Sequence, residues 1–342
     1  IKPHLKTMKN KTLLIAGNEN SILTKRFKQL FVGKFDRIEI TSGIKFDLKH
    51  IIGAFFKTRR LLKELKPDMI VLYQLNLTAF IVALAKKRSI PTLAVAIGSD
   101  VLVMPKRGFV FKAMLRYILK SSDAFNAVCP YLVEQMRQYA PKNANIVLAN
   151  LGIELVKPAT KENIVYSNRL HSPLYRIDDI IRAFANFVSK PEYVSWRLVV
   201  AANGREEELL NLVKELKIES KVSFVGWLSP EKNKEYYAKS KIYVSIPCSD
   251  GLPNSLMEAM SAECLTIVSD LPSYKGLIAN GKNCLVVSDE EIAKADYIEK
   301  VLQMNEEELR LNNQQFLSEY ADIETNRRKY WEIVDELLQP CS

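Results

Sequence analysis

The sequence predicts an α/β protein with two successive domains, each built around a parallel sheet. Short apolar segments alternate with amphipathic helical segments, a pattern typical of parallel strands joined by right-handed crossovers. The alternation occurs twice and is interrupted once, at the polar, proline-containing segment 156–161. A chain of 342 residues has room for two domains of about 150 residues each. We therefore expect an N-terminal domain over 1–155, a C-terminal domain over 156–324 and a last helix over about 325–342.

Twelve segments carry the apolar pattern of buried strands. In the first half they are 12–16, 37–40, 69–73, 92–96, 124–128 and 146–149. In the second half they are 164–167, 197–201, 222–225, 242–246, 265–268 and 284–287. The uncharged run 69–85 is short for a membrane span, and Gln74, Asn76 and Thr78 interrupt it. We therefore interpret this run as a strand, a loop and a helix.

The two halves of the chain differ in charge. Residues 1–150 hold 26 Lys and Arg against 9 Asp and Glu, a balance of +17, whereas residues 151–342 hold 23 against 30, a balance of −7. Basic and apolar residues are interleaved over 55–66 and 106–120. In the second of these blocks Lys112, Arg116 and Lys120 are spaced four residues apart, which places them on one stripe of a helix.

A basic amphipathic helix of this kind suits an anionic membrane surface. One alternative is a solvated helix packed on its own domain, and another is a surface that binds nucleic acid. The sequence has no zinc finger and no RNP-type aromatic motif, so we expect no nucleic-acid partner. The charge pattern alone leaves these alternatives for the helix open.

The cysteines and histidines form no pattern of a disulfide framework or a metal site. The five cysteines, at 129, 248, 264, 284 and 341, include no C-x-x-C pair, which indicates a reducing compartment. The three histidines, His4, His50 and His171, are widely spaced, so we expect no metal and no cofactor. The first residues lack the apolar core of a signal peptide, which favours a cytoplasmic location.

Segment 249–260, Ser-Asp-Gly-Leu-Pro-Asn-Ser-Leu-Met-Glu-Ala-Met, is the most informative part of the chain. It joins a predicted strand to a predicted helix, with Asn254 or Ser255 as the expected N-cap. A helix N-terminus offers backbone N–H groups and a positive dipole end, both of which bind phosphate. Asp250 and Glu258 can accept hydrogen bonds from sugar hydroxyls on either side of this turn. The segment therefore predicts a site for a phosphorylated, polyhydroxylated ligand.

The spacing of Asp250 and Glu258 resembles the hallmark of the retaining nucleotide-sugar glycosyltransferases of family 4, which have the GT-B fold. Other segments are similar to motifs of this family and follow in the family's order. They are 97–100 (Ile-Gly-Ser-Asp), 122–128, 150–154 (Asn-Leu-Gly-Ile-Glu), 168–170 (Asn-Arg-Leu), 175–184, 222–226 and 270–273. The resemblance implies two Rossmann-like domains that face each other across a cleft. The N-terminal domain would bind the acceptor, the C-terminal domain would bind the donor, and the last helix would cross back to the first domain.

The resemblance also implies roles for single residues. Arg169 and Arg176 would stabilise the leaving diphosphate, and Asp250 would bind the transferred sugar, so these three form the expected catalytic set. Donor contacts are expected from Glu258 (ribose), Gly251, Leu252, Pro253, Asn254, Ser255, Gly226 and Trp227 (nucleobase), Tyr175 and Gly17. For Trp227 a place in the core is the alternative. The acceptor or membrane side is expected to include Ser99, Asp100, Lys112, Arg116 and Lys120.

The chain departs from the family pattern at several of these positions. Asn168 and Glu263 stand where the family has glycine, Ile97 replaces a histidine, and Tyr175 replaces a lysine. A non-catalytic subunit that binds a nucleotide sugar or acts as a scaffold is therefore an alternative. A sugar-nucleotide epimerase is another, although the histidine pattern does not favour its acid–base chemistry.

The predicted function is sugar transfer, with retention of configuration, from a UDP- or GDP-linked donor. The acceptor is expected to be a glycan or a polyprenyl- or lipid-linked molecule, in envelope polysaccharide or glycolipid assembly. The resemblance, taken together with the basic N-terminal half, implies peripheral association with the cytoplasmic face of the cell membrane. In this family the leaving phosphate helps to deprotonate the acceptor, so neither a separate strong base nor a metal is expected.

Overall fold

The computed structural model describes residues 8–41 and 50–339, so His4 and Cys341 lie outside the described residues. The chain forms two compact units. Unit 1 consists of Ile1–Gly152 and Ile323–Ser342, and unit 2 consists of Ile153–Asp322. The chain enters unit 2 three residues before the predicted division and returns to unit 1 two residues before the predicted last helix.

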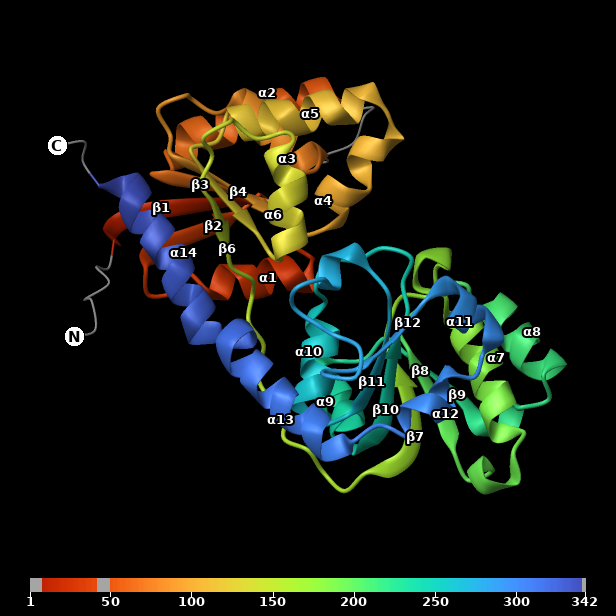
Figure 1. Cartoon of the computed structure of the whole chain (residues 1–342). Coiled ribbons are helices and arrows are strands. Elements are labelled where there is room, and N and C mark those ends of the chain that lie inside the picture. Colours follow the sequence, from red (N-terminus) through yellow and green to blue (C-terminus); the bar gives the residue numbers. More distant parts are fainter. Residues whose placement is uncertain (1–7, 42–49, 340–342) are drawn as a thin grey trace. The chain divides into compact units, whose positions relative to one another are not determined.

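Unit 1 contains a six-stranded parallel sheet in the order β2-β1-β3-β4-β5-β6 (Figure 1). Its central strands are apolar on both faces, as in a sheet that helices cover on both sides. The six predicted strands of this half are confirmed, with β1 beginning four residues before its predicted start. The strands are β1 (Met8–Ala16), β2 (Phe35–Ile40), β3 (Met69–Tyr73), β4 (Thr92–Ala96), β5 (Ala124–Ala127) and β6 (Ile146–Leu148).

Helices connect the strands of unit 1. They are α1 (Ile22–Gln29), α2 (Ile51–Leu65), α3 (Leu77–Ala85), α4 (Ser99–Leu102), α5 (Phe109–Lys120) and α6 (Pro130–Arg137). The run 69–85 is a strand, a loop and a helix, as interpreted from the sequence. Asn76 begins the helical part because its side chain accepts a hydrogen bond from the backbone N–H of Thr78 at 2.9 Å, in the manner of an N-cap.

Helix α14 (Ile323–Leu338) completes the core of unit 1. Tyr330, Ile333 and Val334 are buried in one apolar cluster with side chains of α1 and of strands β1, β3 and β4. Tyr330 also donates a hydrogen bond through its hydroxyl to Asn126 Oδ1 on β5, at 2.9 Å. Residues far apart in the sequence thus form one core.

Two polar contacts hold α14 against the end of α1. The Nζ atom of Lys34 lies 2.6 Å from Asp335 Oδ1, and the Lys34 side chain has an exposed fraction of 0%. Trp331 donates from Nε1 to the carbonyl oxygen of Leu30 at 2.7 Å. The charge of Lys34 is therefore neutralised inside unit 1 by a residue of the last helix.

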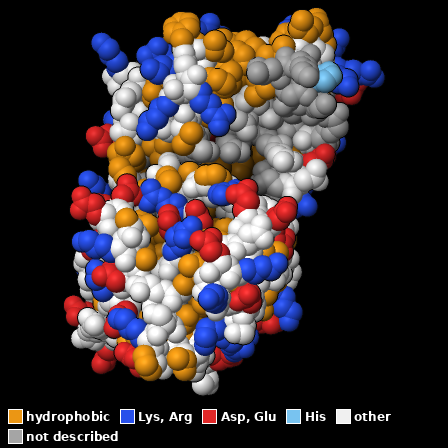
Figure 2. Space-filling view, turned by 90° about the vertical axis from the view of Figure 1, so that its right-hand side faces the viewer, with side chains coloured by type: hydrophobic (Ala, Val, Ile, Leu, Met, Phe, Trp, Pro, Cys, Tyr) orange, Lys and Arg blue, Asp and Glu red, His pale blue; other side chains and the backbone are white. Residues whose placement is uncertain are grey.

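A basic-apolar surface lies on helices α2 and α5 of unit 1, both of which contact α3. Figure 2 shows hydrophobic and basic side chains together on the upper part of the molecule, where acidic side chains are sparse, whereas basic and acidic side chains mix on the lower part. We define the basic-apolar surface by its exposed side chains, Lys112, Arg116, Lys120, Phe109 and Val110 on α5 and Ile52 and Phe56 on α2.

Unit 2 also contains a six-stranded parallel sheet, in the order β12-β11-β10-β7-β8-β9. The strands are β7 (Glu162–Ser167), β8 (Arg197–Ala201), β9 (Val222–Gly226), β10 (Ser240–Ser245), β11 (Leu265–Ser269) and β12 (Leu285–Val287). The six strands predicted for this half are confirmed within a few residues. The strand order places β7 and β10 side by side at the centre of the sheet.

The helices of unit 2 pack on both sides of this sheet, in two buried clusters. They are α7 (Ile177–Val188), α8 (Glu206–Glu215), α9 (Pro230–Lys239), α10 (Asn254–Ser261), α11 (Asp289–Lys294), α12 (Tyr297–Val301) and α13 (Glu306–Phe316). A short π-helix, Leu317–Ala321, follows α13.

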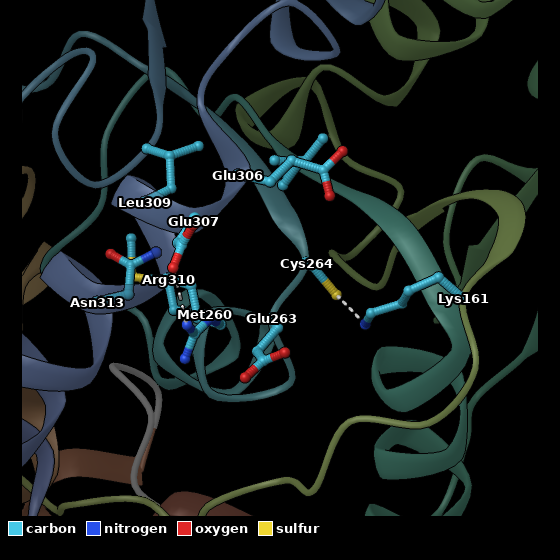
Figure 3. Close-up of a pocket in the computed structure, with 10 residues that line it drawn as sticks. Lys161, Met260, Glu263, Cys264, Glu306, Glu307, Leu309, Arg310 and Asn313 are labelled. Carbon is cyan, nitrogen blue, oxygen red and sulfur yellow. Dashed lines mark hydrogen bonds and ion pairs between the residues drawn. The ribbon is translucent and has the colours of Figure 1, made fainter.

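Lys161 joins the ends of two of these helices. Its ammonium group donates to the carbonyl oxygens of Tyr237 (3.3 Å), Ala238 (3.0 Å) and Ala262 (2.6 Å). These carbonyls lie at the C-terminal ends of α9 and α10, where a positive charge is favourable. Figure 3 shows Lys161 beside Cys264 at a pocket of about 360 Å³, which Glu263 also lines. Glu263 adopts a φ of +61°, so glutamate occupies a left-handed conformation that glycine adopts without strain.

Gly152, the last residue of unit 1 before the chain enters unit 2, has no room for a side chain. Its φ is +65°, and a Cβ atom would lie 2.6 Å from the Cα of Ile323. We expect Gly152→Ala to lower the free energy of unfolding by about 2–5 kcal/mol, from about 1–2 kcal/mol of left-handed backbone strain and about 1–3 kcal/mol of overpacking. Thermal unfolding of the purified protein measures this effect.

Gly281 provides the matched control. Its φ is +77°, but no described atom lies within 4 Å of the Cβ position. Gly281→Ala should therefore show the backbone strain alone. Equal losses in the two variants would contradict the steric explanation for Gly152.

Candidate active site

The candidate site begins at the loop between β10 and α10. This loop carries Asp250, whose Oδ1 accepts a hydrogen bond from the backbone N–H of Gly251 at 2.8 Å. Leu252 and Pro253 follow and are buried. The predicted N-cap is wrong, because α10 begins at Asn254 and the N-cap position belongs to Pro253. Pro253 has a φ of −75° and an extended ψ of 136°, which proline adopts readily at the entrance of a helix.

Arg169 stands at the centre of the site, shortly after the end of β7. Its guanidinium group forms an ion pair with Asp250 and donates from Nη1 to Ser255 Oγ at 2.9 Å. The ring of Tyr175 lies against the same guanidinium group, with its centroid 4.4 Å from Cζ. The structure thus brings together four of the predicted residues, from three separate segments of unit 2.

The charges of this ion pair are partly withdrawn from water. The exposed fraction is 13% for the Arg169 side chain and 22% for that of Asp250. Burial lowers the pKa of Arg169, but the charge of Asp250 and nearby tyrosines outweigh this effect, so its pKa is raised overall. The site therefore holds a permanently charged guanidinium group at the N-terminal end of α10, where anions bind.

A layer of polar side chains behind Arg169 was not predicted from the sequence. Asn168 donates from Nδ2 to Asn233 Oδ1 at 2.9 Å and to the Tyr237 hydroxyl at 2.7 Å. Its Oδ1 accepts a hydrogen bond from the Tyr243 hydroxyl at 2.9 Å. A sequence signal for this layer exists, since Tyr166 and Tyr243 lie inside buried-strand patterns and a buried tyrosine hydroxyl needs a partner.

Glu258 lies on α10, one helical turn beyond Ser255 and on the same face of the helix. It is half-buried. Burial raises the pKa of Tyr243 to about 12, and the negative charge of Glu258 also acts to raise it. The charge of Glu258 therefore acts on the tyrosine layer.

Arg176 faces a different partner from Arg169. It donates from Nη1 to Asp289 Oδ1 at 2.6 Å and from Nε to the Cys248 sulfur at 3.0 Å. Burial lowers the pKa of Arg176, but its bonds to Asp289 and Cys248 outweigh this effect and raise it. The side chain thus binds the start of α11, and the guanidinium group that contacts Asp250 is that of Arg169.

Gly226 and Trp227 lie at the end of β9. Gly226 has a φ of +66°, and its carbonyl oxygen accepts a hydrogen bond from the backbone N–H of Ala202 at 2.7 Å. Trp227 has an exposed fraction of 59%, so the alternative that it belongs to the core is wrong. An exposed indole at a strand end offers a flat apolar surface to a ligand.

The predicted residues of unit 1 have well-defined local roles. Gly17 donates its backbone N–H to Thr41 Oγ1 at 3.2 Å, at the end of β1. Asp100 is 1% exposed, and its oxygens accept hydrogen bonds from the backbone N–H groups of Leu75 and Gly98, both at 2.9 Å. Burial raises the pKa of Asp100. Instead of offering a free carboxylate to an acceptor, Asp100 holds two loops together, while Ser99 beside it is exposed.

Two kinds of feature are absent from the described residues, 8–41 and 50–339. Within these ranges no group of three or more His, Cys, Asp or Glu side chains could hold a metal ion. In the same part of the chain no helix is both long enough and apolar enough to cross a membrane.

Comparison with protein families identifies both halves of the chain. Residues 153–316 match the family model described as glycosyl transferases group 1, and residues 21–128 match the model described as glycosyl transferase 4-like. The chain belongs to the family 4 glycosyltransferases. The two matched ranges fall within unit 2 and unit 1 of this glycosyltransferase, respectively.

Two curated relatives are similar to parts of this glycosyltransferase. One is the N-acetylgalactosamine-N,N'-diacetylbacillosaminyl-diphospho-undecaprenol 4-alpha-N-acetylgalactosaminyltransferase of Campylobacter jejuni, 27% identical over 139 residues, or 38% of this chain. The other is an uncharacterized glycosyltransferase of Haemophilus influenzae, 34% identical over 96 residues, or 27% of this chain. The matches span 36% and 26% of the lengths of these relatives.

Solved structures confirm the GT-B fold. Sucrose-phosphate synthase from Thermosynechococcus elongatus matches with a TM-score of 0.77 at 13% identity, over 96% of this chain and 99% of that one. The Anabaena protein HepE in complex with UDP-glucose matches with a TM-score of 0.76 at 14% identity, over 96% of this chain and 100% of that one. The predicted fold class, two α/β domains of the GT-B type, is thereby confirmed.

We expect His171 to make the stability of this glycosyltransferase sensitive to acid. It is 3% exposed, its Nε2 lies 3.2 Å from the carbonyl oxygen of Ala201, and its Nδ1 has no hydrogen-bond partner among the described residues. Burial lowers its pKa below the ordinary value. In the unfolded chain the group binds a proton near pH ~6.5. As the pH falls below this value the unfolded state takes up more protons, so we expect the free energy of unfolding to decrease.

His171→Gln should flatten this decrease between pH ~7 and ~5. Chemical unfolding at several pH values measures it, with the exposed His50→Gln as the matched control. If His171→Gln kept the full pH dependence, another group would be responsible.

Proposed function

We propose that this glycosyltransferase moves a sugar from a nucleotide-diphosphate sugar to a hydroxyl group of an acceptor, with retention of anomeric configuration. The observation that carries the proposal is the contact of the Arg169 guanidinium group with Asp250 and Ser255 at the start of α10. A cation and a helix N-terminus at one place suit the diphosphate of a nucleotide sugar. A carboxylate beside them suits the hydroxyls of the sugar.

The donor side of the proposal assigns each group one contact. The diphosphate would lie at Arg169 and the first N–H groups of α10, and the transferred sugar at Asp250. The ribose would bind Glu258, and the nucleobase would lie near Gly226 and Trp227. HepE, which has the same fold, was crystallised with UDP-glucose, and this supports a nucleotide sugar of the UDP or GDP class as the donor.

In the proposed reaction the bond between the anomeric carbon and the oxygen of the leaving phosphate breaks. Arg169 stabilises the negative charge that grows on this phosphate. The acceptor hydroxyl attacks the same face of the sugar, and its proton passes to the departing phosphate. The products are the glycosylated acceptor and a nucleoside diphosphate, so the reaction needs neither a separate base nor a cofactor.

For the acceptor we propose a glycan or a polyprenyl- or lipid-linked molecule at the cytoplasmic face of the cell membrane. The name of the Campylobacter jejuni relative describes a diphospho-undecaprenol acceptor and an N-acetylgalactosaminyl group, which supports this class. The enzyme would then be a hexosyltransferase that takes part in the assembly of envelope polysaccharide or glycolipid.

A thermal-shift screen tests the donor site. The purified protein is heated with UDP, GDP, ADP, CMP and their common sugar conjugates, and the screen is repeated with Glu258→Ala. Ligand at a hundred times its dissociation constant stabilises the fold by about 2.7 kcal/mol. We expect a shift with one base that Glu258→Ala loses and that Glu207→Ala, an exposed control on α8, keeps. No shift with any nucleotide would favour the scaffold alternative.

The basic-apolar surface supports the proposed membrane location. Phe109 and Val110 are 79% and 67% exposed, next to the basic stripe Lys112, Arg116 and Lys120. On an anionic bilayer the apolar side chains would enter the headgroup region while the basic ones contact lipid phosphates. The enzyme would then lie on the membrane that holds a lipid-linked acceptor.

Flotation with vesicles tests this location. We expect binding to vesicles that contain phosphatidylglycerol and none to vesicles of phosphatidylcholine alone. Reversing the charges of Lys112, Arg116 and Lys120 should weaken binding by at least about a hundredfold, because the lost attraction is about 1 kcal/mol for each basic residue and the new acidic residues are also repelled. Reversal of Lys214, Lys282 and Lys294, which are exposed on unit 2, is the control. Unchanged binding of the first variant would refute the proposed surface.

A further inference from the structure

The chain departs from the family motif at two positions near Arg169. One of them directly precedes Arg169 in the chain, and the side chain of the other contacts its guanidinium group. Asn168 stands where the resemblance has glycine, and Tyr175 where it has lysine. We propose that Asn168 and Tyr175 are positioning residues that hold a single arginine, Arg169, in the orientation needed at the leaving diphosphate. This inference rests on the proposed function, because it concerns the step that Arg169 is assigned there.

Asn168 is fixed from two neighbouring elements. Its Nδ2 donates to Asn233 and Tyr237 of α9, and its Oδ1 accepts from Tyr243 of β10. Both protons of the amide group and one lone pair of its oxygen are used. Tyr237 and Tyr243 are 0% exposed, so the network is anchored in the core of unit 2. The backbone immediately before Arg169 is therefore held by a network that a glycine does not provide.

The guanidinium group of Arg169 is fixed on the other side of the residue. The guanidinium group lies over the ring of Tyr175, with Cζ 4.4 Å from the ring centroid, while Asp250 and Ser255 bind its nitrogen atoms. A planar cation between an aromatic face and two acceptors keeps its orientation with little further loss of entropy on binding a phosphate. At position 175, where the resemblance has a lysine as a second cation, this chain thus has a tyrosine that is suited to orient the guanidinium group of Arg169.

The neighbouring Arg176 does not replace that second cation in this arrangement. Its guanidinium group binds Asp289 at 2.6 Å and the Cys248 sulfur. The electrostatic stabilisation of the leaving group then depends on one arginine whose position is fixed before the donor binds. Such preorganisation acts on the transition state more than on ground-state binding.

The test separates positioning from simple stability. We would prepare Asn168→Ala, Tyr175→Leu, Tyr175→Phe and Tyr243→Phe, each in the wild-type chain and in an Arg169→Lys background. Two quantities are measured for each protein. The first is the kcat for hydrolysis of UDP-glucose, or of the conjugate that gives the thermal shift, in which water takes the sugar and the nucleoside diphosphate is released. The second is the Kd of the free nucleoside diphosphate, measured by calorimetry. Asn163→Ala, on β7 and bonded only to Ser195 among described side chains, is the matched control.

We expect Asn168→Ala and Tyr175→Leu to lower kcat by about 10- to 100-fold, since a misplacement of about 1 Å costs this much. The Kd should change by less than about threefold, because base and ribose contacts remain. Tyr175→Phe keeps the ring and Tyr243→Phe removes a single bond, so their losses should be smaller. In the Arg169→Lys background each second substitution should lower kcat by less than about twofold, because residues that act through one another are not additive.

Three results would overturn the inference. The first is a wild-type kcat in Asn168→Ala and Tyr175→Leu when Arg169→Lys has a lowered kcat. The second is a lower melting temperature of these variants with unchanged kcat. The third is a loss of kcat in the Arg169→Lys background that equals the loss in the wild-type chain. Failure of the proposed function looks different, because the wild-type protein would then neither bind UDP, GDP, ADP or CMP nor release any of them from a sugar conjugate.

Discussion

Replacing Arg169 with alanine is expected to lower kcat for sugar transfer by about 10²–10³-fold, the loss that follows removal of one preorganised donor to a developing negative charge. Arg169 is the cation whose guanidinium group contacts both Asp250 and Ser255 at the start of α10. The negative charge on the leaving phosphate grows only during the reaction. The loss should therefore appear mainly in kcat, and less in the affinity for the nucleoside diphosphate.

The rate of nucleoside diphosphate release measures this effect, and two comparisons make it specific. Arg197→Ala removes an exposed arginine of β8 that pairs with Glu162 at 3.0 Å, and it should keep full activity. Thermal unfolding shows whether Arg169→Ala is folded, since the variant leaves Asp250 without its ion-pair partner. A folded Arg169→Ala variant with the activity of the wild type would remove Arg169 from the mechanism.

Asp335→Asn is expected to destabilise unit 1 by about 3–5 kcal/mol, the range for breaking one partner of a buried ion pair. The side chain of Lys34 is 0% exposed and its ammonium group lies 2.6 Å from Asp335. Without the carboxylate, a positive charge stays in the interior with less compensation. Lys34→Met should cost less, because it removes the buried charge and leaves Asp335, which is 25% exposed, in contact with water.

Hydrogen exchange of α14 in increasing urea measures the stability of unit 1 separately, since a chain of two units need not unfold in one step. Faster exchange is expected in α14 and in α1, which share the apolar cluster around Tyr330. Glu332→Gln, an exposed position on the same helix, is the control. If Lys34→Met were the more damaging variant, the cost of a buried charge without its carboxylate would not decide the stability, and other contacts of the ammonium group, such as that with the Trp331 ring, would.

The sheets could be predicted from the sequence because their strands are buried on both faces. Every residue of β3 and of β11 is buried, and both strands are short segments rich in apolar and β-branched residues, which favours a strand over a helix. Strand β1 was predicted too short, because the polar residues Lys9, Asn10 and Lys11 interrupt its apolar pattern, and Asn10 is exposed. An apolar pattern indicates which residues are buried and not which backbone groups form the hydrogen bonds of a sheet, so it does not predict the polar N-terminal part of β1.

The candidate site could be predicted only in part. Asp250, Arg169, Tyr175 and Ser255 follow from motifs, and the structure brings them together. The buried tyrosines indicate that hydroxyl partners exist, but the choice of Asn168 as the partner could not be predicted, since its contacts lie on α9 and β10 and short-range patterns carry no information about pairing over such distances. Asp100 was misjudged for a related reason. An aspartate after glycine and serine looks available to a ligand, and only the fold shows that backbone N–H groups occupy its oxygens.

The assignment of α14 to unit 1 has a consequence for the order in which the chain acquires its structure during translation. The ribosome releases all of Ile153–Asp322 before it releases the helix that supplies Tyr330, Ile333 and Val334 to the first core. Unit 2 can therefore fold as a continuous segment. The residues of unit 1 that are synthesised earlier leave part of their apolar cluster uncovered until α14 is released. Nascent chains stalled before residue 323 should consequently bind chaperones through the residues of unit 1, which are synthesised first. Unit 2 would then fold before unit 1, whereas the N-terminal domain of a chain usually folds first.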